Sequence, residues 1–517
     1  MLTPFGELPA SWVEHASRSE LHDLVRVRAS RRSFLKGAAL AGLGVASPAL
    51  WTQSARAAEA GPAVVSHVGV GVDPRTEATV SFASAGPFRT ALVEYGPTGA
   101  FGGSAAVDVR SVAGVDTRYG HAVLSGLAPG TTYRYRVRLD GVVMPGATLT
   151  TAPGSAQPFS FTAFGDEGVS PSAAAIVGQI RRLDPAFHLL AGDLCYADSS
   201  GQGRHTDRFD PTVWDAWLRQ VEPVASRTAW MCATGNHDME PGYGPQGYDG
   251  YLGRFVVPGN GAPGCPTTYA FRYGNVGVVS LDANDVSYEI THNTGYSDGR
   301  QSAWLDRQLA AYRDAGSGVD FIVVVFHHCA YSTSTSHGSD GGVRRHWVPI
   351  FDRHRVDLVV NGHAHLYERT APLRGGVVTG PAPVGGRVDA SSGTTYVTAG
   401  GGGRRRDGGG FVRVGSTVTQ LDRTRTPEPA EWTLPSRSTE HCFLHVSVTP
   451  AAPPLPATMT VRAVGLHGQL LDSVTLVAPP RADAPPRGWL VESAVGVTGA
   501  ALALRQVRHR PAPGHDT

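Results

Sequence analysis

The sequence predicts an α/β layered domain preceded by a smaller all-β domain. Three observations support this prediction. Short strand-like runs separated by glycine, proline and aspartate turns fill residues 62–152. From residue 158 onward, apolar runs alternate with helix-like stretches, and polar motifs follow several of the runs. The length of 517 residues also favours more than one domain.

The all-β domain is expected to span residues 62–152 as a β-sandwich. Strand-like segments lie at 78–82, 91–95 and 131–137, and the last of them alternates with period two. Residues 127–135, Leu-Ala-Pro-Gly-Thr-Thr-Tyr-Arg-Tyr, resemble part of a fibronectin type III domain. No cluster of metal ligands occurs in this stretch, so we interpret it as a packing domain.

The α/β domain is expected to span residues 158–478, after a short linker. A hairpin that turns at Gly274-Asn275 adds an antiparallel element, so the sheet is expected to be mixed. C-terminal strands are expected to extend the sheet, and 479–517 is a proline-rich tail with no assigned role. The predicted strands are 159–164, 186–191, 230–233, 269–273, 276–281, 321–326, 356–360, 395–399, 443–448, 459–463 and 471–476, and the predicted helices are 173–183, 214–221, 301–312 and 343–353.

The N-terminus is typical of an exported protein. Ser-Arg-Arg-Ser-Phe-Leu-Lys at 30–36 precedes an apolar stretch at 37–50 and then Ala55-Arg56-Ala57. This pattern resembles a twin-arginine signal peptide, which implies cleavage near Ala58 and the twin-arginine export machinery as a partner. We therefore expect residues 1–57 to be a signal peptide and the protein to be secreted, periplasmic or associated with the cell wall. The apolar stretch is too short for an integral membrane segment.

Composition excludes several classes of function. Lys+Arg is 45 and Asp+Glu is 44, so no charge excess favours nucleic acid as a partner. The single lysine is Lys36, so no phosphate-binding loop of the Gly-Lys-Ser/Thr type is possible. The glycine-rich run 400–410 carries three arginines, and we favour a surface loop over a phosphate-binding cluster. The cysteines, Cys195, Cys232, Cys265, Cys329 and Cys442, form no Cys-x-x-Cys pair.

Five polar motifs follow strand-like runs. Loops at the ends of parallel strands are where open α/β sheets bind ligands. Aspartate, asparagine and histidine are ligands for divalent and trivalent metals. We therefore expect the five motifs to converge on one metal site. They are Gly-Asp-Glu-Gly at 165–168, Gly-Asp-Leu-Cys-Tyr-Ala-Asp at 192–198, Gly-Asn-His-Asp at 235–238, His-His at 327–328 and Asn-Gly-His-Ala-His at 361–365.

The motifs supply enough ligands for two metal ions. A two-metal hydrolase holds its cations about 3.5–4 Å apart and leaves positions open for water and substrate. Repulsion between the cations requires a shared anion, so one carboxylate must bridge them. Two aspartates, one asparagine, three histidines and a tyrosine from separate loops meet that requirement.

The order of these motifs resembles the metallophosphoesterase superfamily. Within it, residues 192–198 and Gly-His-Ala-His-Leu-Tyr-Glu-Arg at 362–369 look like the purple acid phosphatases, and the resemblance extends over roughly residues 66–476. It implies a β-sandwich followed by an αββα catalytic domain. It also implies a phosphatase that cleaves phosphomonoesters through attack of a metal-bound hydroxide.

The resemblance also implies roles for individual residues. An iron(III) would be bound by Asp166, Asp193, Tyr196 and His365, with Asp193 as the bridge. A zinc(II), manganese(II) or iron(II) would be completed by Asn236, His327 and His363. His237 and His337 would contact the substrate, and either could protonate the leaving oxygen.

Two departures from the family pattern leave alternatives open. Asp238 stands where plant members usually carry glutamate, and His328-Cys329-Ala330-Tyr331 lacks the usual proline. His328 could compete with His327 as a ligand, and we prefer His327 because its spacing to Tyr331 matches the family.

A phosphodiesterase or phospholipase that uses manganese or zinc is the alternative function. A non-enzymatic cell-wall protein is a remote one. The sequence leaves the substrate and the oligomeric state open.

Overall fold

The structure is a computed structural model that describes residues 64–97, 100–198, 200–203, 208–334, 337–404 and 436–478, together with the short strands β1 (Leu2–Thr3) and β2 (Gly6–Glu7). Most of the predicted signal peptide, the C-terminal tail, Arg405 and Arg406 lie outside these ranges. Within them, no helix is both long enough and apolar enough to cross a membrane. The five cysteines lie within them too, and all are buried and free.

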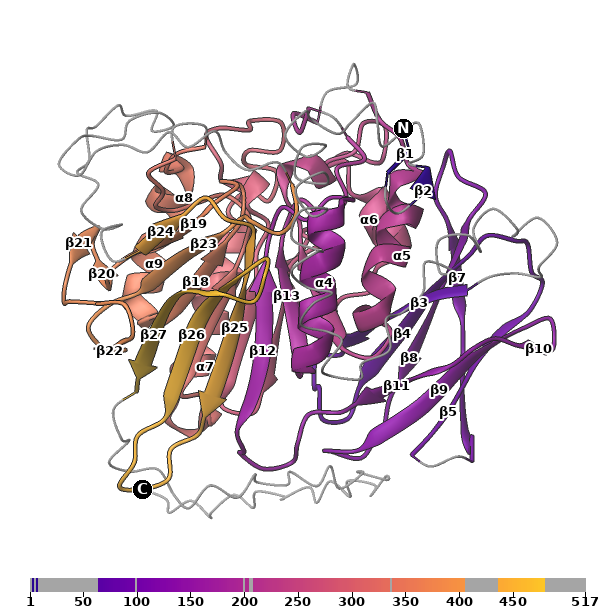
Figure 1. Cartoon of the computed structure of the whole chain (residues 1–517), viewed down its shortest axis with the longest axis horizontal. Coiled ribbons are helices and arrows are strands. Elements are labelled where there is room, and N and C mark those ends of the chain that lie inside the picture. Colours follow the sequence, from indigo (N-terminus) through magenta and orange to yellow (C-terminus); the bar gives the residue numbers. More distant parts are fainter. Residues whose placement is uncertain are drawn as a thin grey trace, which may run out of the picture.

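An all-β sandwich forms the N-terminal part of the described chain, as expected (Figure 1). Alternate residues of its strands, such as Tyr133, Tyr135 and Val137, are buried against Val80 and Phe82 of the facing sheet. One sheet has the order β3 (Val64–Val70), β4 (Ala78–Ser84), β8 (Arg118–Leu124), β7 (Asp108–Ser111). The other has the order β10 (Val142–Val143), β9 (Thr132–Leu139), β5 (Ala91–Gly96), β6 (Gly103–Ala106), with β11 (Ala147–Thr150) beside β9.

Two seven-stranded sheets build the α/β domain, and both are mixed. In the first, β12, β13 and β14 are parallel and β25 to β27 run antiparallel. Its order is β14 (Ala229–Ala233), β13 (Phe187–Ala191), β12 (Phe159–Phe164), β25 (Cys442–Thr449), β26 (Thr458–Gly465), β27 (Leu470–Val477), β22 (Gly386–Asp389).

The second sheet begins with the expected hairpin, in which Tyr273 pairs with Val276. Its central strands β16, β17, β18 and β23 are parallel. Its order is β15 (Tyr269–Tyr273), β16 (Val276–Ser280), β17 (Phe321–Val325), β18 (Leu358–Asn361), β23 (Thr395–Ala399), β19 (Tyr367–Arg369), β24 (Ser436–Ser438). A separate pair, β20 (Leu373–Arg374) and β21 (Val377–Val378), lies outside it.

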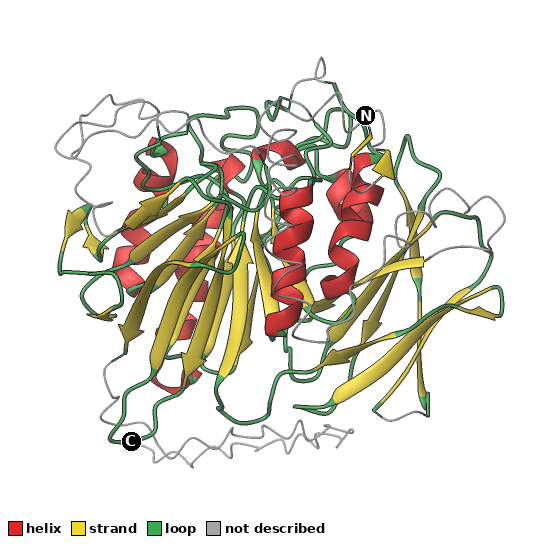
Figure 2. Ribbon diagram, in the orientation of Figure 1, coloured by secondary structure: helices red, strands yellow, loops and turns green. Residues whose placement is uncertain are grey.

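The two sheets face each other and helices cover their outer faces (Figure 2). Phe161 and Leu189 of the first sheet pack with Val323 and Val360 of the second in one buried core. Helices α4 (Pro171–Leu183) and α5 (Val213–Ala225) cover the first sheet, and α7 (Arg300–Arg313), α8 (Gly341–His346) and α9 (Val348–His354) cover the second. The predicted αββα arrangement is therefore confirmed.

One predicted helix is divided in two. Residues 343–353 were expected to form a single helix, but α8 ends at His346 and α9 begins at Val348. Pro349 lies in the first turn of α9. Because proline has no N–H and its ring clashes with the carbonyl four residues earlier, one continuous helix through residue 349 is unfavourable.

Candidate metal centre

Four strand ends from the two sheets bring the candidate ligands together. Asp166 follows β12, Asp193 follows β13, His327 follows β17 and His363 follows β18. Ligand atoms of Asp166, Asp193 and His327 lie within 4.8 Å of one another, and all three side chains are buried. The backbone joins the loops, since Asp166 donates its N–H to the Gly192 carbonyl at 3.1 Å. Burial of two carboxylates beside one imidazole is costly unless a cation compensates their charge.

The backbone at the site is held in an uncommon conformation. Asp166, Asp193, Tyr196 and His363 have φ angles of 62°, 55°, 58° and 69°. Residues other than glycine rarely adopt this left-handed region, and each one that does so costs on the order of 1 kcal/mol or more. Residues of this kind gather at functional sites, where the surrounding structure holds them in place.

His327 presents one ring nitrogen to the two aspartates. Its Nδ1 lies 2.8 Å from the Ala191 carbonyl and therefore carries the proton. Its Nε2 lies 3.3 Å from an Asp193 oxygen and 4.0 Å from an Asp166 oxygen. Burial lowers the pKa of His327, but the two carboxylates outweigh it and raise the pKa to about 10. A metal cation between His327 and the aspartates would take the place of the proton on Nε2, as metal binding at histidine generally does.

Tyr196 and His365 meet at the Asp166 oxygen that also faces His327. The Tyr196 hydroxyl donates to an Asp166 oxygen at 3.1 Å and lies 3.1 Å from His365 Nε2. The same His365 nitrogen is 3.4 Å from Asp166. Burial, followed by the charges of Asp166 and Asp193, raises the pKa of Tyr196 well above its usual value. A phenolate at this position therefore requires a cation.

Asn236 offers a buried acceptor. Its amide nitrogen donates to the Gly201 carbonyl at 3.0 Å, whereas its Oδ1 is buried and has no hydrogen-bond partner in the part of the chain that the structure describes. Buried acceptors of this kind are rare and call for a water or an ion. The neighbouring His237 donates its backbone N–H to an Asp193 oxygen at 2.9 Å. The orphaned oxygen and the surrounding nitrogen and oxygen donors therefore fit a pair of metal ions.

Two comparisons with known proteins agree with this site. Residues 160–367 match the calcineurin-like phosphoesterase family, and residues 66–163 match the N-terminal domain of purple acid phosphatases. Over 419 residues, the chain is 37% identical to an uncharacterized protein of Mycobacterium tuberculosis, which covers 71% of this chain and 77% of that protein. This chain is a purple acid phosphatase-like member of the calcineurin-like phosphoesterases.

Plant purple acid phosphatases are more distant relatives of this phosphoesterase. Purple acid phosphatase 23 of Arabidopsis thaliana is 29% identical over 273 residues, which is 48% of this chain and 57% of that protein. The structure of a purple acid phosphatase from yellow lupin seeds superposes with a TM-score of 0.64 at 20% identity, covering 81% of this chain and 75% of that chain. The lupin structure supports the fold.

The two histidines predicted to contact substrate both lie beside predicted ligands. The His237 ring is 4.4 Å from the Tyr196 ring, and its Nδ1 lies 2.8 Å from the Asp198 carbonyl. The His337 ring is 4.4 Å from the His363 ring. His328 lies 4.4 Å from His363 as well, and within the described chain neither of its buried ring nitrogens has a partner. His327, and not His328, contacts the aspartates.

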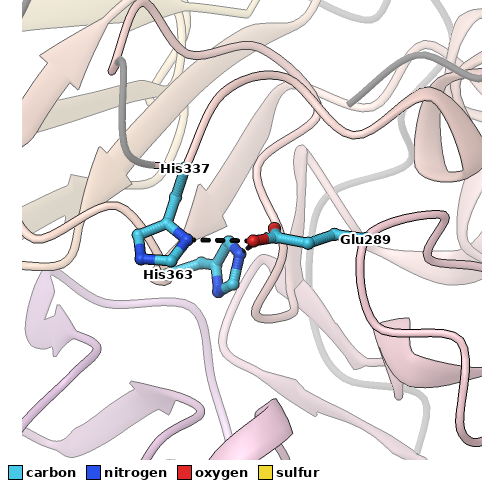
Figure 3. A group of neighbouring side chains, drawn as sticks. All are labelled: Glu289, His337 and His363. Carbon is cyan, nitrogen blue, oxygen red and sulfur yellow. Dashed lines mark hydrogen bonds and ion pairs between the residues drawn. The ribbon is translucent and has the colours of Figure 1, made fainter. Parts of the chain in front are cut away.

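Glu289 belongs to the site but was not predicted. It accepts a hydrogen bond from His337 Nδ1 at 3.1 Å and contacts His363 Nε2 (Figure 3). Burial raises the pKa of Glu289, but the charge and hydrogen bonds of His363 and His337 outweigh burial and leave the pKa well below its usual value. Glu289 follows no strand-like run and belongs to none of the five motifs, so no signal in the sequence indicated it.

Asp238 and Arg404 are further neighbours of the ligands. The buried Asp238 carboxylate accepts backbone N–H groups of Asp193, Leu194 and Gly235 at 2.9, 3.1 and 2.8 Å. It therefore fixes the loop that carries Asp193. Arg404, in the run predicted to be a surface loop, places its guanidinium 4.3 Å from the centre of the Tyr196 ring. That residue of the run is therefore part of the site.

Proposed function

We propose that this phosphoesterase hydrolyses phosphomonoesters at a centre of two metal ions. The observation that carries the proposal is the contact of the Tyr196 hydroxyl with both Asp166 and His365, beside the group of Asp166, Asp193 and His327. A phenolate is a hard, anionic ligand that suits iron(III), and the neutral donors suit a divalent ion. The matched plant relatives carry the name purple acid phosphatase, which supports a monoester substrate.

The proposed ligands divide between the two ions. When bound, the ions supply Lewis acidity, a lowered pKa of water and neutralisation of charge on the phosphoryl oxygens. Asp193 is proposed as the bridge because one of its oxygens faces His327 while the Asp193 loop adjoins Asp166. Iron(III) would be held by Asp166, Asp193, Tyr196 and His365, and zinc(II), manganese(II) or iron(II) would be held by Asp193, Asn236, His327 and His363.

The chain's own side chains complete the chemistry. His237 is fixed by the Asp198 carbonyl and His337 by Glu289, so each ring has a defined orientation beside the ligands. In the proposal one of the two binds the phosphoryl group and the other donates a proton to the departing alcohol oxygen.

The direct test is the activity of Asp193→Ala. Loss of the bridging carboxylate removes several kcal/mol of transition-state stabilisation, so we expect roughly 1,000-fold lower kcat/KM with p-nitrophenyl phosphate. Asp298→Asn is the control, because it removes an exposed carboxylate from the loop before α7 and should leave kcat/KM unchanged. Full activity of Asp193→Ala would refute the proposal. Faster turnover of bis(p-nitrophenyl) phosphate than of the monoester would favour a phosphodiesterase.

We also infer that the protein is exported by the twin-arginine pathway. The inference rests on Arg31-Arg32, the apolar stretch at 37–50 and the Ala55-Arg56-Ala57 signal. Folding before export would allow the metal ions to be bound inside the cell. N-terminal sequencing of protein recovered outside the cytoplasm should give a start near Ala58, and a start at Met1 would contradict export by cleavage.

A further inference from the structure

Glu289 joins a predicted metal ligand to a predicted substrate contact. It lies in the connection between the 3₁₀ turn η3 (Ala283–Asp285) and α7, and its side chain is 15% exposed. One carboxylate oxygen contacts His363 Nε2 and the other accepts the His337 Nδ1–H at 3.1 Å (Figure 3). Such a carboxylate can set the orientation of both rings at once.

The geometry of His363 shows which of its nitrogens faces the predicted metal. Its Nδ1 lies 3.2 Å from His327 Nε2, the same atom that is 3.3 Å from Asp193. Its Nε2 points the other way, to Glu289. A histidine binds a cation through a nitrogen without a proton and usually donates the other N–H to a carboxylate or a carbonyl. His327 follows the same rule with the roles of its nitrogens exchanged. Its Nδ1–H donates to the Ala191 carbonyl, and its Nε2 faces Asp193.

The loop that carries Glu289 is fixed by a second buried carboxylate. Asp340, 1% exposed, accepts the Ser287 hydroxyl at 2.7 Å and the Tyr288 N–H at 3.1 Å. It also caps α8 by accepting the Gly342 N–H at 2.8 Å. The Glu289 N–H in turn donates to the Ser287 hydroxyl at 3.1 Å. Asp340 and Ser287 therefore hold the backbone of this loop, and with it Glu289, in place beside the two histidines.

We propose that Glu289 is a positioning residue of the divalent metal site. It holds the proton on Nε2 of His363, so that Nδ1 presents its lone pair to the cation, and it orients His337 toward the same site. The inference rests on the proposed function, because it takes His363 as a metal ligand. The inference adds the Glu289 carboxylate to the predicted metal site, and none of the five sequence motifs contains this residue.

A different arrangement would use the same three side chains as a separate cation site. Ligand atoms of Glu289, His337 and His363 lie within 4.8 Å of one another. His363 would then have to bind one cation through each nitrogen, which requires removal of both ring protons. Neutral histidine carries one ring proton and offers one lone pair. We therefore favour the positioning role, and the number of bound metal ions distinguishes the two.

The test compares zinc binding by wild type and Glu289→Gln in the full-length mature protein. Glutamine keeps the shape but has one acceptor oxygen, so it cannot accept from both histidines. Loss of such a partner typically weakens metal binding 10–100-fold. In chelator competition, we expect one of two zinc ions to bind roughly 10–100-fold more weakly and the other to bind as in wild type. Asp298→Asn, from the same connection, should match wild type.

Equal zinc affinity of Glu289→Gln and wild type would overturn the inference. A third zinc in wild type that is absent from Glu289→Gln, with the first two unchanged, would also overturn it, in favour of a separate cation site. A wild type that binds no metal pair would instead contradict the proposed function. The three results are therefore distinguishable by the number of bound zinc ions and their affinities.

A second measurement needs no variant. Nitrogen-15 histidine spectra of the zinc-loaded wild type report which ring nitrogen carries the proton. We expect His363 to be protonated on Nε2, and His363→Asn identifies its signal. A proton on Nδ1 of His363 would overturn the inference even if Glu289→Gln failed to fold.

Discussion

Arg404 lies over the face of Tyr196, the residue on which the proposed iron(III) assignment depends. Its guanidinium is 4.3 Å from the ring centre. A cation at this distance is attracted by the ring, typically by about 0.5–2 kcal/mol. The attraction is stronger for a phenolate, so Arg404 should stabilise the anionic form that binds iron(III).

We predict that Arg404→Met shifts the visible absorption band to longer wavelength. Charge transfer from the phenolate to iron(III) removes electron density from the ring, and a nearby cation opposes that transfer. Loss of on the order of 1 kcal/mol corresponds to a shift of roughly 10 nm in the visible range. Arg387→Met, at an exposed position of β22, is the control. A shift to shorter wavelength in Arg404→Met would contradict the argument.

Single residues also show where the sequence was informative. Asp166, Asp193, His327 and His363 could be grouped because each follows a buried strand, and parallel strand ends converge. Glu289 could not be found this way, since it lies in a connection whose path depends on Asp340 from another loop. The ligand roles of the grouped residues stay predictions until metal binding is measured.

At the level of elements, the loop after β13 is held by the turn after β14. Asp238 ends the 3₁₀ turn η2 (Asn236–Asp238) and accepts N–H groups from both loops. Its carboxylate is fully buried. The same turn carries Asn236 and His237, so one side chain fixes the positions of predicted ligands from two strands.

Asp238→Ala should destabilise the protein and loosen the Asp193 loop. It leaves the buried N–H groups of Asp193, Leu194 and Gly235 without their acceptor. Each unsatisfied group costs about 1–3 kcal/mol, so we expect the free energy of unfolding to fall by several kcal/mol. Urea denaturation with chelator present measures this without the contribution of metal. Stability equal to that of wild type would show that water replaces the carboxylate at little cost.

Element boundaries illustrate what periodicity can and cannot predict. The strand predicted at 159–164 agrees with β12, because its apolar run ends at the glycine of the first motif. The helix predicted at 343–353 is broken at Trp347, because apolar spacing alone does not register the proline at 349. Apolar periodicity therefore predicts where the strands and helices lie, whereas local backbone chemistry determines where each of them ends.

At the scale of the whole molecule, the β-sandwich packs on the phosphoesterase domain through buried histidines. His121 of β8 contacts the Ser81 hydroxyl at 2.8 Å and the Gly253 carbonyl at 3.1 Å. The His67 ring of β3 lies 5.0 Å from the Phe255 ring. Burial is the main cause that lowers the pKa of His121 to about 4 and that of His67 to about 3.

Because of these histidines, we predict that the protein loses stability in acid. Because folding lowers both pKa values, their contribution is present above pH 6.5 and is lost as the pH falls toward 4 for His121 and 3 for His67. The shift at His121 corresponds to about 3 kcal/mol. His121→Gln should therefore flatten the decline in urea midpoint between pH 7 and pH 4, and the exposed His467→Gln should not. Parallel declines in both variants would exclude His121 as the cause.

The organisation of the whole chain followed from composition and pattern, but the contact between its domains did not. An all-β stretch before alternating strands and helices predicted a sandwich and an α/β layered domain, and the family resemblance implied the αββα arrangement; all three are confirmed. The positions of His67 and His121 at the contact depend on how the two domains pack. Alternation of apolar and polar residues predicts that one face of a strand is buried, but it does not predict which element packs against that face.

The visible absorption spectrum of the protein purified with its native metals tests the central claim most directly. Tyr196 lies 3.1 Å from both Asp166 and His365, so iron(III) bound there would be ligated by a phenolate. We predict a broad visible band in wild type that disappears in Tyr196→Phe, with metal content near two ions per chain. A colourless protein that carries two divalent ions and cleaves phosphoesters would contradict the assignment of iron(III) to Tyr196.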